Sequence, residues 1–398
     1  MVASQAAPSL FTHCNPLLAM TVRPLLVALL LGLVGFPGCD SGGPEPGTVL
    51  WKTPAATEAL APTQPLVTGG RVFVTYGEEF GALDTQDGAV LWTTPLYRSS
   101  TAGAVLDGDG VVHLNQVDWV KAFAKDDGQT VWTAALDAPR TISRARMVQN
   151  ATHLFLGRRG EVVRIRKADG VIDLRIDLSD RTPEGVPALA YDVALSPDGT
   201  VLYVPIGYYV PDAPETGGYV VAFDAATGAE RWTFEPPPQT TASGFAVGTS
   251  VYGLAAGAEV VVAPIGLTVY GLDPGSGAVL WDTFFDADGF DVGATLDGDN
   301  VYIGSLQGRV FSLDAADGNI QWSGELSGGL STPLVVRNDL IYLTSPFEGS
   351  AWTVDTSNGS VRSRDRPAGD LLLAPIAVEG RTMYSVSSTA VYAIEGPR

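Results

Sequence analysis

A short unit of apolar strands and polar turns repeats along most of the chain. Each unit has an apolar strand, a turn of the Asp-Gly kind and a second strand. It then ends in a phrase with a glycine followed, four residues later, by an anchor residue. Short strands bounded by glycine-rich turns predict an all-β fold, and a period of about 40 residues predicts four-stranded propeller blades. The final phrase occurs at 81–92, 121–132, 163–174, 221–232, 270–281, 311–322 and 352–363.

Three positions of this phrase have identifiable physical roles. The glycine supplies the positive φ that a tight hairpin turn needs, and an aspartate four residues earlier accepts hydrogen bonds from the turn amides. A tryptophan at the anchor position buries on the order of 150–250 Å² at the seam to the neighbouring blade. The predicted docking residues are Trp51, Trp92, Trp132, Trp232, Trp281 and Trp322, with Gly88, Gly128, Gly228, Gly277 and Gly318. Leu174 and Ser363 replace the tryptophan in two copies.

The anchors together predict an eight-bladed β-propeller of four-stranded antiparallel blades over residues 47–398. Residues 375–398 supply the first three strands of a blade and stop before the outer one. Residues 47–51 read as an outer strand that lacks a blade. We therefore expect the N-terminal strand to pair into the last blade, which closes the ring and leaves no free sheet edge.

Three segments exceed the repeat: 174–192, 206–219 and 234–248. Because strands alternate in direction across a blade, all three are expected on one face and in one sector, where long loops on a rigid scaffold commonly carry function. Aromatic residues and arginine are favoured anchors of protein interfaces. The candidate partner surface is Arg181, Tyr191, Tyr208, Tyr209, Tyr219, Phe234 and Phe245. Loop growth without function is the alternative interpretation.

Charge narrows the choice of partner. The net charge is −20, which argues against nucleic acid because phosphate binding needs a basic face. The third repeat departs from this acidity, and we expect it to form a local positive patch that steers an acidic partner; a solvated strand face with alternating charges is the alternative. Its cations are Arg140, Arg144, Arg146, Arg158, Arg159, Arg164, Arg166, Lys167 and Arg175.

The repeats contain few residues of the types that carry out catalysis or bind metals. Cys14 and Cys39 both precede them, so the folded body has no disulfide and no thiolate. His113 and His153 are its only histidines, and the acidic stretch 286–291 is interpreted as a surface turn because it lacks the ladder of a calcium loop. We predict no catalytic residue, no metal and no cofactor.

The N-terminal region predicts export. Arg23 precedes an apolar run at 24–36, which is too short to span a bilayer comfortably. Cys39 after small residues resembles the bacterial lipobox, which implies lipidation of Cys39, a leader at 1–38 and a tether at 39–46. A simple cleaved signal is the alternative, and Met20 is a candidate true start.

The glycine and tryptophan phrase resembles the tryptophan-docking motif of the PQQ-type propeller family throughout 47–398. With the lipobox, the chain is most similar to the BamB-type lipoproteins of outer-membrane assembly. That resemblance implies a non-catalytic, monomeric scaffold on the periplasmic side of a membrane. Its partners would be envelope proteins, with the β-barrel assembly machine as the specific candidate, and the outer membrane is favoured over the inner membrane. A ligand-binding or adhesive surface propeller is the alternative. A PQQ-dependent dehydrogenase is disfavoured because that class resembles the chain in fold but carries adjacent cysteines in its pocket.

Overall fold

The computed structural model describes residues 47–55, 63–76, 78–96, 104–106, 111–115, 118–137, 146–190, 192–210, 216–244, 246–330, 332–367 and 370–397. These residues form β-strands and turns, with one short 3₁₀ helix, η1 (Ser179–Arg181). Within these ranges no helix has the length and apolarity needed to cross a membrane. The predicted leader, the tether and Cys39 lie outside the described residues.

The first three sheets each have four antiparallel strands in sequence order. Their strands are β2 (Leu66–Thr68), β3 (Arg71–Tyr76), β4 (Glu79–Asp84) and β5 (Val90–Pro95); β6 (Val105–Leu106), β7 (Val111–Asn115), β8 (Trp119–Ala124) and β9 (Thr130–Ala135); β10 (Met147–Gln149), β11 (His153–Arg158), β12 (Glu161–Arg166) and β13 (Ile172–Asp177).

Three later sheets repeat this order. Their strands are β21 (Ala255–Ala256), β22 (Val261–Ile265), β23 (Thr268–Leu272) and β24 (Val279–Phe284); β25 (Thr295–Asp297), β26 (Asn300–Gly304), β27 (Arg309–Asp314) and β28 (Ile320–Glu325); β29 (Val335–Arg337), β30 (Leu340–Ser345), β31 (Ser350–Asp355) and β32 (Val361–Asp365).

The sheet in the middle of the chain differs from the others. It has five strands, β14 (Leu189–Ala190), β15 (Ala194–Leu195), β16 (Val201–Tyr209), β17 (Thr216–Asp224) and β18 (Glu230–Phe234). The inner position is divided between β14 and β15, which pair with different parts of the long β16. A separate two-stranded ribbon follows, β19 (Gln239–Thr240) and β20 (Ala246–Val247).

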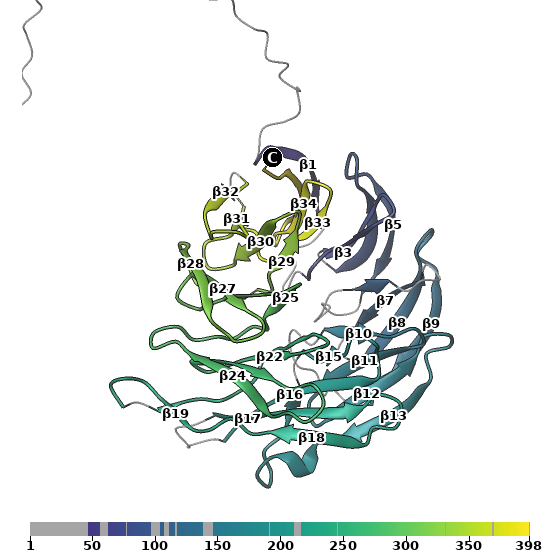
Figure 1. The fold of residues 1–398 in the computed structure, drawn as a ribbon. Helices are drawn as coiled ribbons and strands as arrows, with labels where there is room; N and C mark the ends of the chain where they lie inside the picture. Colours follow the sequence, from purple (N-terminus) through teal and green to yellow (C-terminus); the bar gives the residue numbers. More distant parts are fainter. Residues whose placement is uncertain are drawn as a thin grey trace, which may run out of the picture. The chain divides into compact units, whose positions relative to one another are not determined.

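The N-terminal strand completes the last sheet, as predicted. This sheet joins β1 (Val49–Pro54) to β33 (Ala377–Glu379), β34 (Thr382–Val386) and β35 (Ala390–Glu395). Trp51 pairs with Ala393, and the Gly47 amide donates to the carbonyl of Glu395 at 2.7 Å. The inner strand β33 also contacts β2, so the last sheet meets the first (Figure 1).

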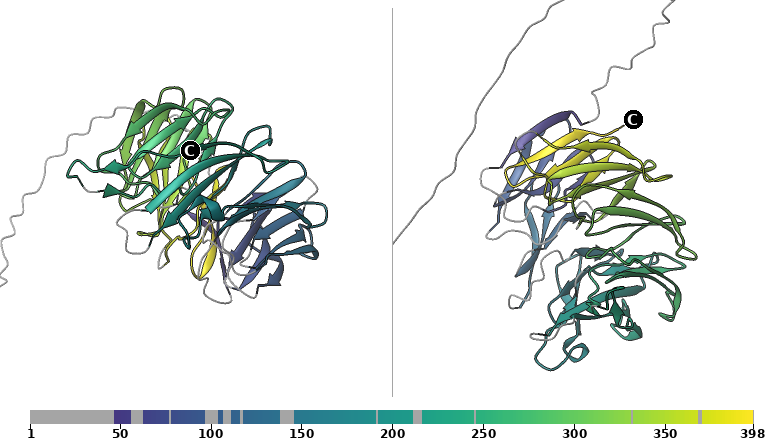
Figure 2. Two further views of the ribbon diagram at one scale, coloured as in Figure 1. Left: turned by 90° about the horizontal axis from the view of Figure 1, so that it is seen from below. Right: turned by 90° about the vertical axis from the view of Figure 1, so that its left-hand side faces the viewer.

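The predicted all-β propeller is confirmed, whereas the predicted count of eight four-stranded blades is wrong. Seven blades have four strands. The extra residues of 174–192 add a strand to the sheet that follows them, so that sheet has five. The sheets succeed one another around the fold in sequence order, as two further views also show (Figures 1 and 2).

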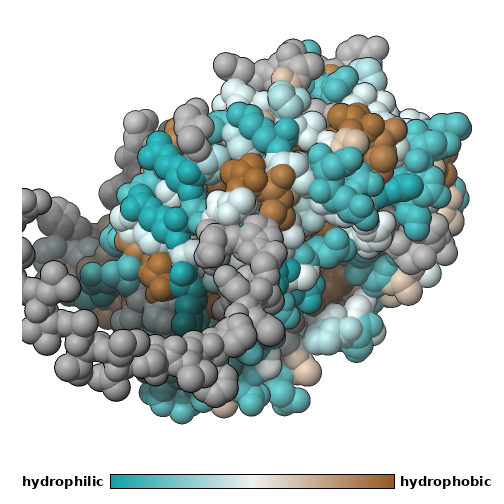
Figure 3. Space-filling model, turned by 90° about the horizontal axis from the view of Figure 1, so that it is seen from above, coloured by the Kyte–Doolittle hydropathy of each residue, from teal (hydrophilic) through white to brown (hydrophobic). Residues whose placement is uncertain are grey.

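The core lies in the seams between neighbouring sheets. Buried side chains from the facing sheets form separate apolar clusters, each joining one sheet to the next. Burial against a neighbour stabilises each sheet because one sheet alone leaves an apolar face in water. On the face seen from above, the coloured residues are largely hydrophilic, and hydrophobic residues form separate patches among them (Figure 3).

Candidate partner-binding face

Six seams share one contact between a tryptophan and a glycine. A Cβ added to the turn glycine would lie less than 3.0 Å from the indole of the preceding sheet, and each of these glycines has a positive φ. Each indole N–H also donates to a turn carbonyl at 2.8–3.0 Å. The tryptophans are Trp51, Trp92, Trp132, Trp232, Trp281 and Trp322, over Gly88, Gly128, Gly170, Gly277, Gly318 and Gly359.

The turn aspartates accept hydrogen bonds from local amides, as predicted. Asp84 accepts from the Gln86 amide at 2.7 Å, and Asp224, Asp273, Asp314 and Asp355 do the same in their turns. The pKa of Asp224 is lowered to about 2, first by its bond from Arg231 and then by the amide of Thr227. These carboxylates therefore have a structural task in the turns.

The seam between the β10–β13 and β14–β18 sheets uses a different donor. Leu174 and Ile176 cover Gly228 there. Arg164 donates to the carbonyls of Ala225 and Ala226 at 2.9 and 2.5 Å, and Ala225 holds the position whose carbonyl takes an indole bond in other seams. A guanidinium on one strand thus supplies the hydrogen bond that the missing tryptophan would make.

Asp173 orients that guanidinium. It accepts from Arg164 Nε at 2.9 Å and lies 3.0 Å from His153 Nε2. Burial opposes ionisation of Asp173, but the bonds from Arg164 and His153 outweigh it and lower its pKa.

The last seam has neither the tryptophan contact nor the arginine donor of the other seams. Ser363 takes the anchor position, and Asp365 packs against Gly47. Asp365 is 8% exposed, and Ser363 Oγ donates to it at 2.7 Å. Burial raises the pKa of Asp365 because a charged carboxylate loses its water there.

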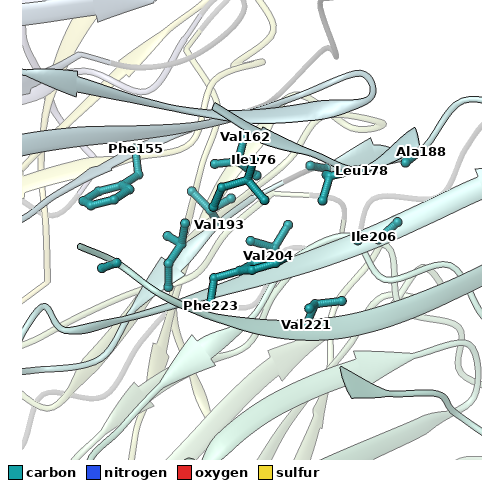
Figure 4. Close-up of a cluster of buried hydrophobic side chains, with 13 residues drawn as sticks. Phe155, Val162, Ile176, Leu178, Ala188, Val193, Val204, Ile206, Val221 and Phe223 are labelled. Atoms are coloured by element: carbon teal, nitrogen blue, oxygen red, sulfur yellow. The ribbon is translucent and has the colours of Figure 1, made fainter. Parts of the chain in front are cut away.

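The insertion at 174–192 is fixed to the scaffold at both ends. Leu178 and Ala188 are fully buried in the seam beside Val162 and Ile206 (Figure 4). The Leu178 amide donates to Gly160, and the Gly160 amide donates to Ala188, at 3.0 and 2.8 Å. The β11–β12 turn is therefore held between the two ends of the insertion.

Arg181 lies in this insertion but is engaged within the chain. Its guanidinium pairs with Glu230 on β18 and lies 3.6 Å from Asp180. The hydrogen bond that Arg181 donates to Glu230 raises the pKa of Arg181 and outweighs the opposing effect of burial. Arg181 therefore ties the insertion to the outer strand of the next sheet.

Two tyrosines of the β16–β17 hairpin stack on each other, and a third is exposed. Tyr208 stacks on Tyr219, with ring centroids 6.0 Å apart, and covers Gly217 on the paired strand. Burial, followed by a hydrogen bond with Tyr208, raises the pKa of Tyr219 to about 12. Tyr209 is 58% exposed. Of the three, Tyr209 offers the largest aromatic surface to a partner.

The remaining candidates divide between the core and the undescribed residues. Phe234 packs against Tyr270 of the next sheet, with ring centroids 5.2 Å apart, so much of it serves a seam. Tyr191 and Phe245 lie outside the described residues. The structure thus brings Tyr208 and Tyr219 together, leaves Tyr209 exposed, and assigns Arg181 and Phe234 to internal contacts.

The expected positive patch is largely neutralised by ion pairs. Arg146 pairs with Asp192, Arg158 with Glu161, Arg164 with Asp173, Arg166 with Asp169, and Arg175 with Glu161 and Asp137. Arg140 and Arg144 lie outside the described residues. The charge pattern alone did not reveal all of these partners because half of the pairs join residues at least 14 positions apart.

The described residues line a cavity beside the insertion and another among the inner strands. One of about 740 Å³ lies beside the insertion, between the β11–β12 turn and residues 185–188. Its charged lining is Arg159, Glu161, Arg175 and Asp177. The other, of about 490 Å³, is lined mostly by apolar residues of the inner strands. Sequence reasoning missed the first cavity because two segments that are not adjacent in sequence form its walls.

The acidic stretch at 286–291 has an internal role. Asp288 is fully buried, pairs with Arg309 and accepts from Ser305 Oγ at 2.8 Å. Among the residues that the structure describes, no group of three or more His, Cys, Asp or Glu side chains is arranged to hold a metal.

The comparison with known families decides the relationship. The profile of the family described as "Outer membrane protein assembly factor BamB" matches residues 43–117, 116–364 and 266–395. The chain belongs to this family. The Escherichia coli (strain K12) protein of that name is 29% identical over 142 residues, which are 35% of this chain and 36% of that protein. The similarity therefore spans about a third of that relative's length.

Solved structures share the fold. BamB from Moraxella catarrhalis superposes with a TM-score of 0.64 and 16% identity, covering 86% of this chain and 99% of that one. The quinohemoprotein alcohol dehydrogenase ADHIIG from Pseudomonas putida HK5 gives 0.65 and 13%, covering 87% and 76%. At such identities the likeness concerns the fold alone, and enzymes share it with assembly factors.

Proposed function

We propose that the chain is a non-catalytic scaffold of outer-membrane protein assembly, anchored through a lipid on Cys39. Its partners are envelope proteins, with components of the β-barrel assembly machine as the specific candidates. Family membership supports the assembly role and an outer-membrane location, and the leader pattern supports export. In this role the six tryptophan seams act as structural docking sites.

One observation carries the choice of binding face. The β16–β17 hairpin presents Tyr209 at 58% exposure beside the stacked pair of Tyr208 and Tyr219, on a scaffold whose insertion at 174–192 is held by buried contacts. An exposed aromatic on a rigid frame is a favourable interface anchor because little conformational entropy is lost on binding.

The test is affinity capture from detergent-solubilised envelopes with the full chain as bait. We expect Tyr209→Ala to reduce recovery of barrel-assembly components about tenfold, while the melting temperature changes little because Tyr209 is exposed. Phe347→Ala is the matched control because Phe347 is an aromatic 71% exposed in the β30–β31 turn, outside the insertions. Equal recovery with Tyr209→Ala would show that the wrong face was chosen.

The lipid anchor has its own test. Palmitate labelling combined with membrane fractionation should place the wild-type chain in the outer membrane, and Cys39→Ser should abolish both labelling and membrane retention. Retention of unlabelled Cys39→Ser in the membrane fraction would contradict the anchor.

The cavity of the inner strands favours a second function, a ligand-binding propeller. Pockets of about 300–1,000 Å³ with mostly apolar walls and few polar groups are common ligand sites. The cavity of about 490 Å³ has this character, with Gln64, Arg146 and Arg337 among its polar lining residues. Recovery of a small molecule, and of no assembly component, would favour this function.

A further inference from the structure

The β11–β12 turn carries an arginine that its neighbours leave available. Arg159 is exposed and forms no ion pair with any carboxylate in the described ranges. The flanking Arg158 differs, since it is 2% exposed and bonds to Glu161 at 2.6 Å. Adjacent arginines on one turn thus have opposite roles, one buried within the fold and one directed to solvent.

The backbone around Arg159 is held on both sides. Gly160 has a φ of +78°, and its amide donates to Ala188, while its carbonyl accepts from Leu178. Arg159 itself forms an antiparallel bridge with Leu189. Its guanidinium therefore extends from a fixed base, which lowers the entropy cost of engaging a ligand.

The cavity of about 740 Å³ opens beside this arginine and adds a second cation. Arg175 bonds to Glu161 at 3.0 Å and to Asp137 at 2.9 Å. The Asp137 side chain is 85% exposed, so water screens that pair and an incoming carboxylate can replace it. Glu161 pairs with both Arg158 and Arg175. It therefore does not compensate the charge of Arg159.

We propose that this cavity binds a carboxylate presented by a partner protein, with Arg159 as its main contact and Arg175 as the second. The inference rests on the proposed scaffold function and names the chemistry that the partner brings, an aspartate or glutamate side chain or a chain terminus. Guanidinium matches a carboxylate in a bidentate geometry, and such bonds are among the stronger ones in proteins.

The experiment measures fluorescence anisotropy of a labelled peptide of alternating Glu and Ala against the full chain, with the Gln and Ala counterpart as reference. We expect the acidic peptide to bind at least about tenfold more tightly, and Arg159→Gln to remove that difference. Arg159→Lys should retain part of it, because lysine keeps the charge and loses the fork geometry.

Arg166→Gln is the matched control. Arg166 has a side chain that is 44% exposed, already pairs with Asp169, and lies at the opposite end of β12. Equal or absent binding of the two peptides, or an equal loss with Arg166→Gln, overturns the carboxylate site. The proposed function fails separately, if the wild-type chain captures no assembly component while the peptide result holds.

Discussion

The closing strand gives the sharpest test of the seam contacts. Trp51→Ala removes an indole that is 8% exposed, lies over Gly88, donates to the Thr85 carbonyl at 2.9 Å and approaches the ring of Tyr384 to 5.9 Å. An indole buries on the order of 150–250 Å², worth about 4–6 kcal/mol at about 25 cal/mol per Å². The denatured chain already hides part of that area, so we expect a loss of about 3–5 kcal/mol in the free energy of unfolding.

The assay is urea denaturation followed by far-ultraviolet circular dichroism, which reports the strands. Leu50→Ala on the same strand is the control, because Leu50 is 39% exposed and its loss should cost no more than about 0.5 kcal/mol. Equal midpoints for Trp51→Ala and Leu50→Ala would refute the argument that the tryptophan joins the last sheet to the first.

Three further predictions concern the other seams. Gly128→Ala should lower the melting temperature more than Gly380→Ala. Both glycines have a positive φ, but only Gly128 has an indole, that of Trp92, against its missing side chain; a larger loss for Gly380→Ala would contradict this. Arg164→Met should cost about 1–3 kcal/mol in urea melts because the carbonyl of buried Ala225 loses its donor, and an unchanged midpoint would refute the role of Arg164 as a substitute donor. Burial raises the pKa of Asp365, so the stability it contributes is present below the unfolded pKa and is lost as the pH rises through the folded pKa. Asp365→Asn should therefore remove this pH dependence and stabilise the protein at about pH 7, and an unchanged pH profile would contradict it.

The repeat made the strands and their order predictable. Glycine followed by tryptophan at fixed spacing reports a contact that recurs in every such seam, so one sequence pattern identifies many equivalent contacts. The pairing of the first strand with the last sheet was predictable for a related reason, since 375–398 lacks an outer strand and 47–51 supplies one.

The departures from the repeat were harder to predict. The donor function of Arg164 depends on the position of the Ala225 carbonyl, 61 residues away, and the role of Arg181 depends on Glu230, 49 residues away. The division of the inner strand into β14 and β15 depends on how 174–192 folds back onto β16. Each of these features is a tertiary pairing, which a local pattern of apolar and polar residues does not encode.

The position at which the chain enters the ring also distinguishes the two faces of the propeller. Gly47 joins the last sheet at the end of the strands where the glycine turns lie. The β16–β17 loop and the insertion at 174–192 leave from the opposite end of their strands. The chain therefore enters the ring at the end of the strands opposite to the insertions, so a lipid on Cys39, as proposed, would act on the propeller through its turn side.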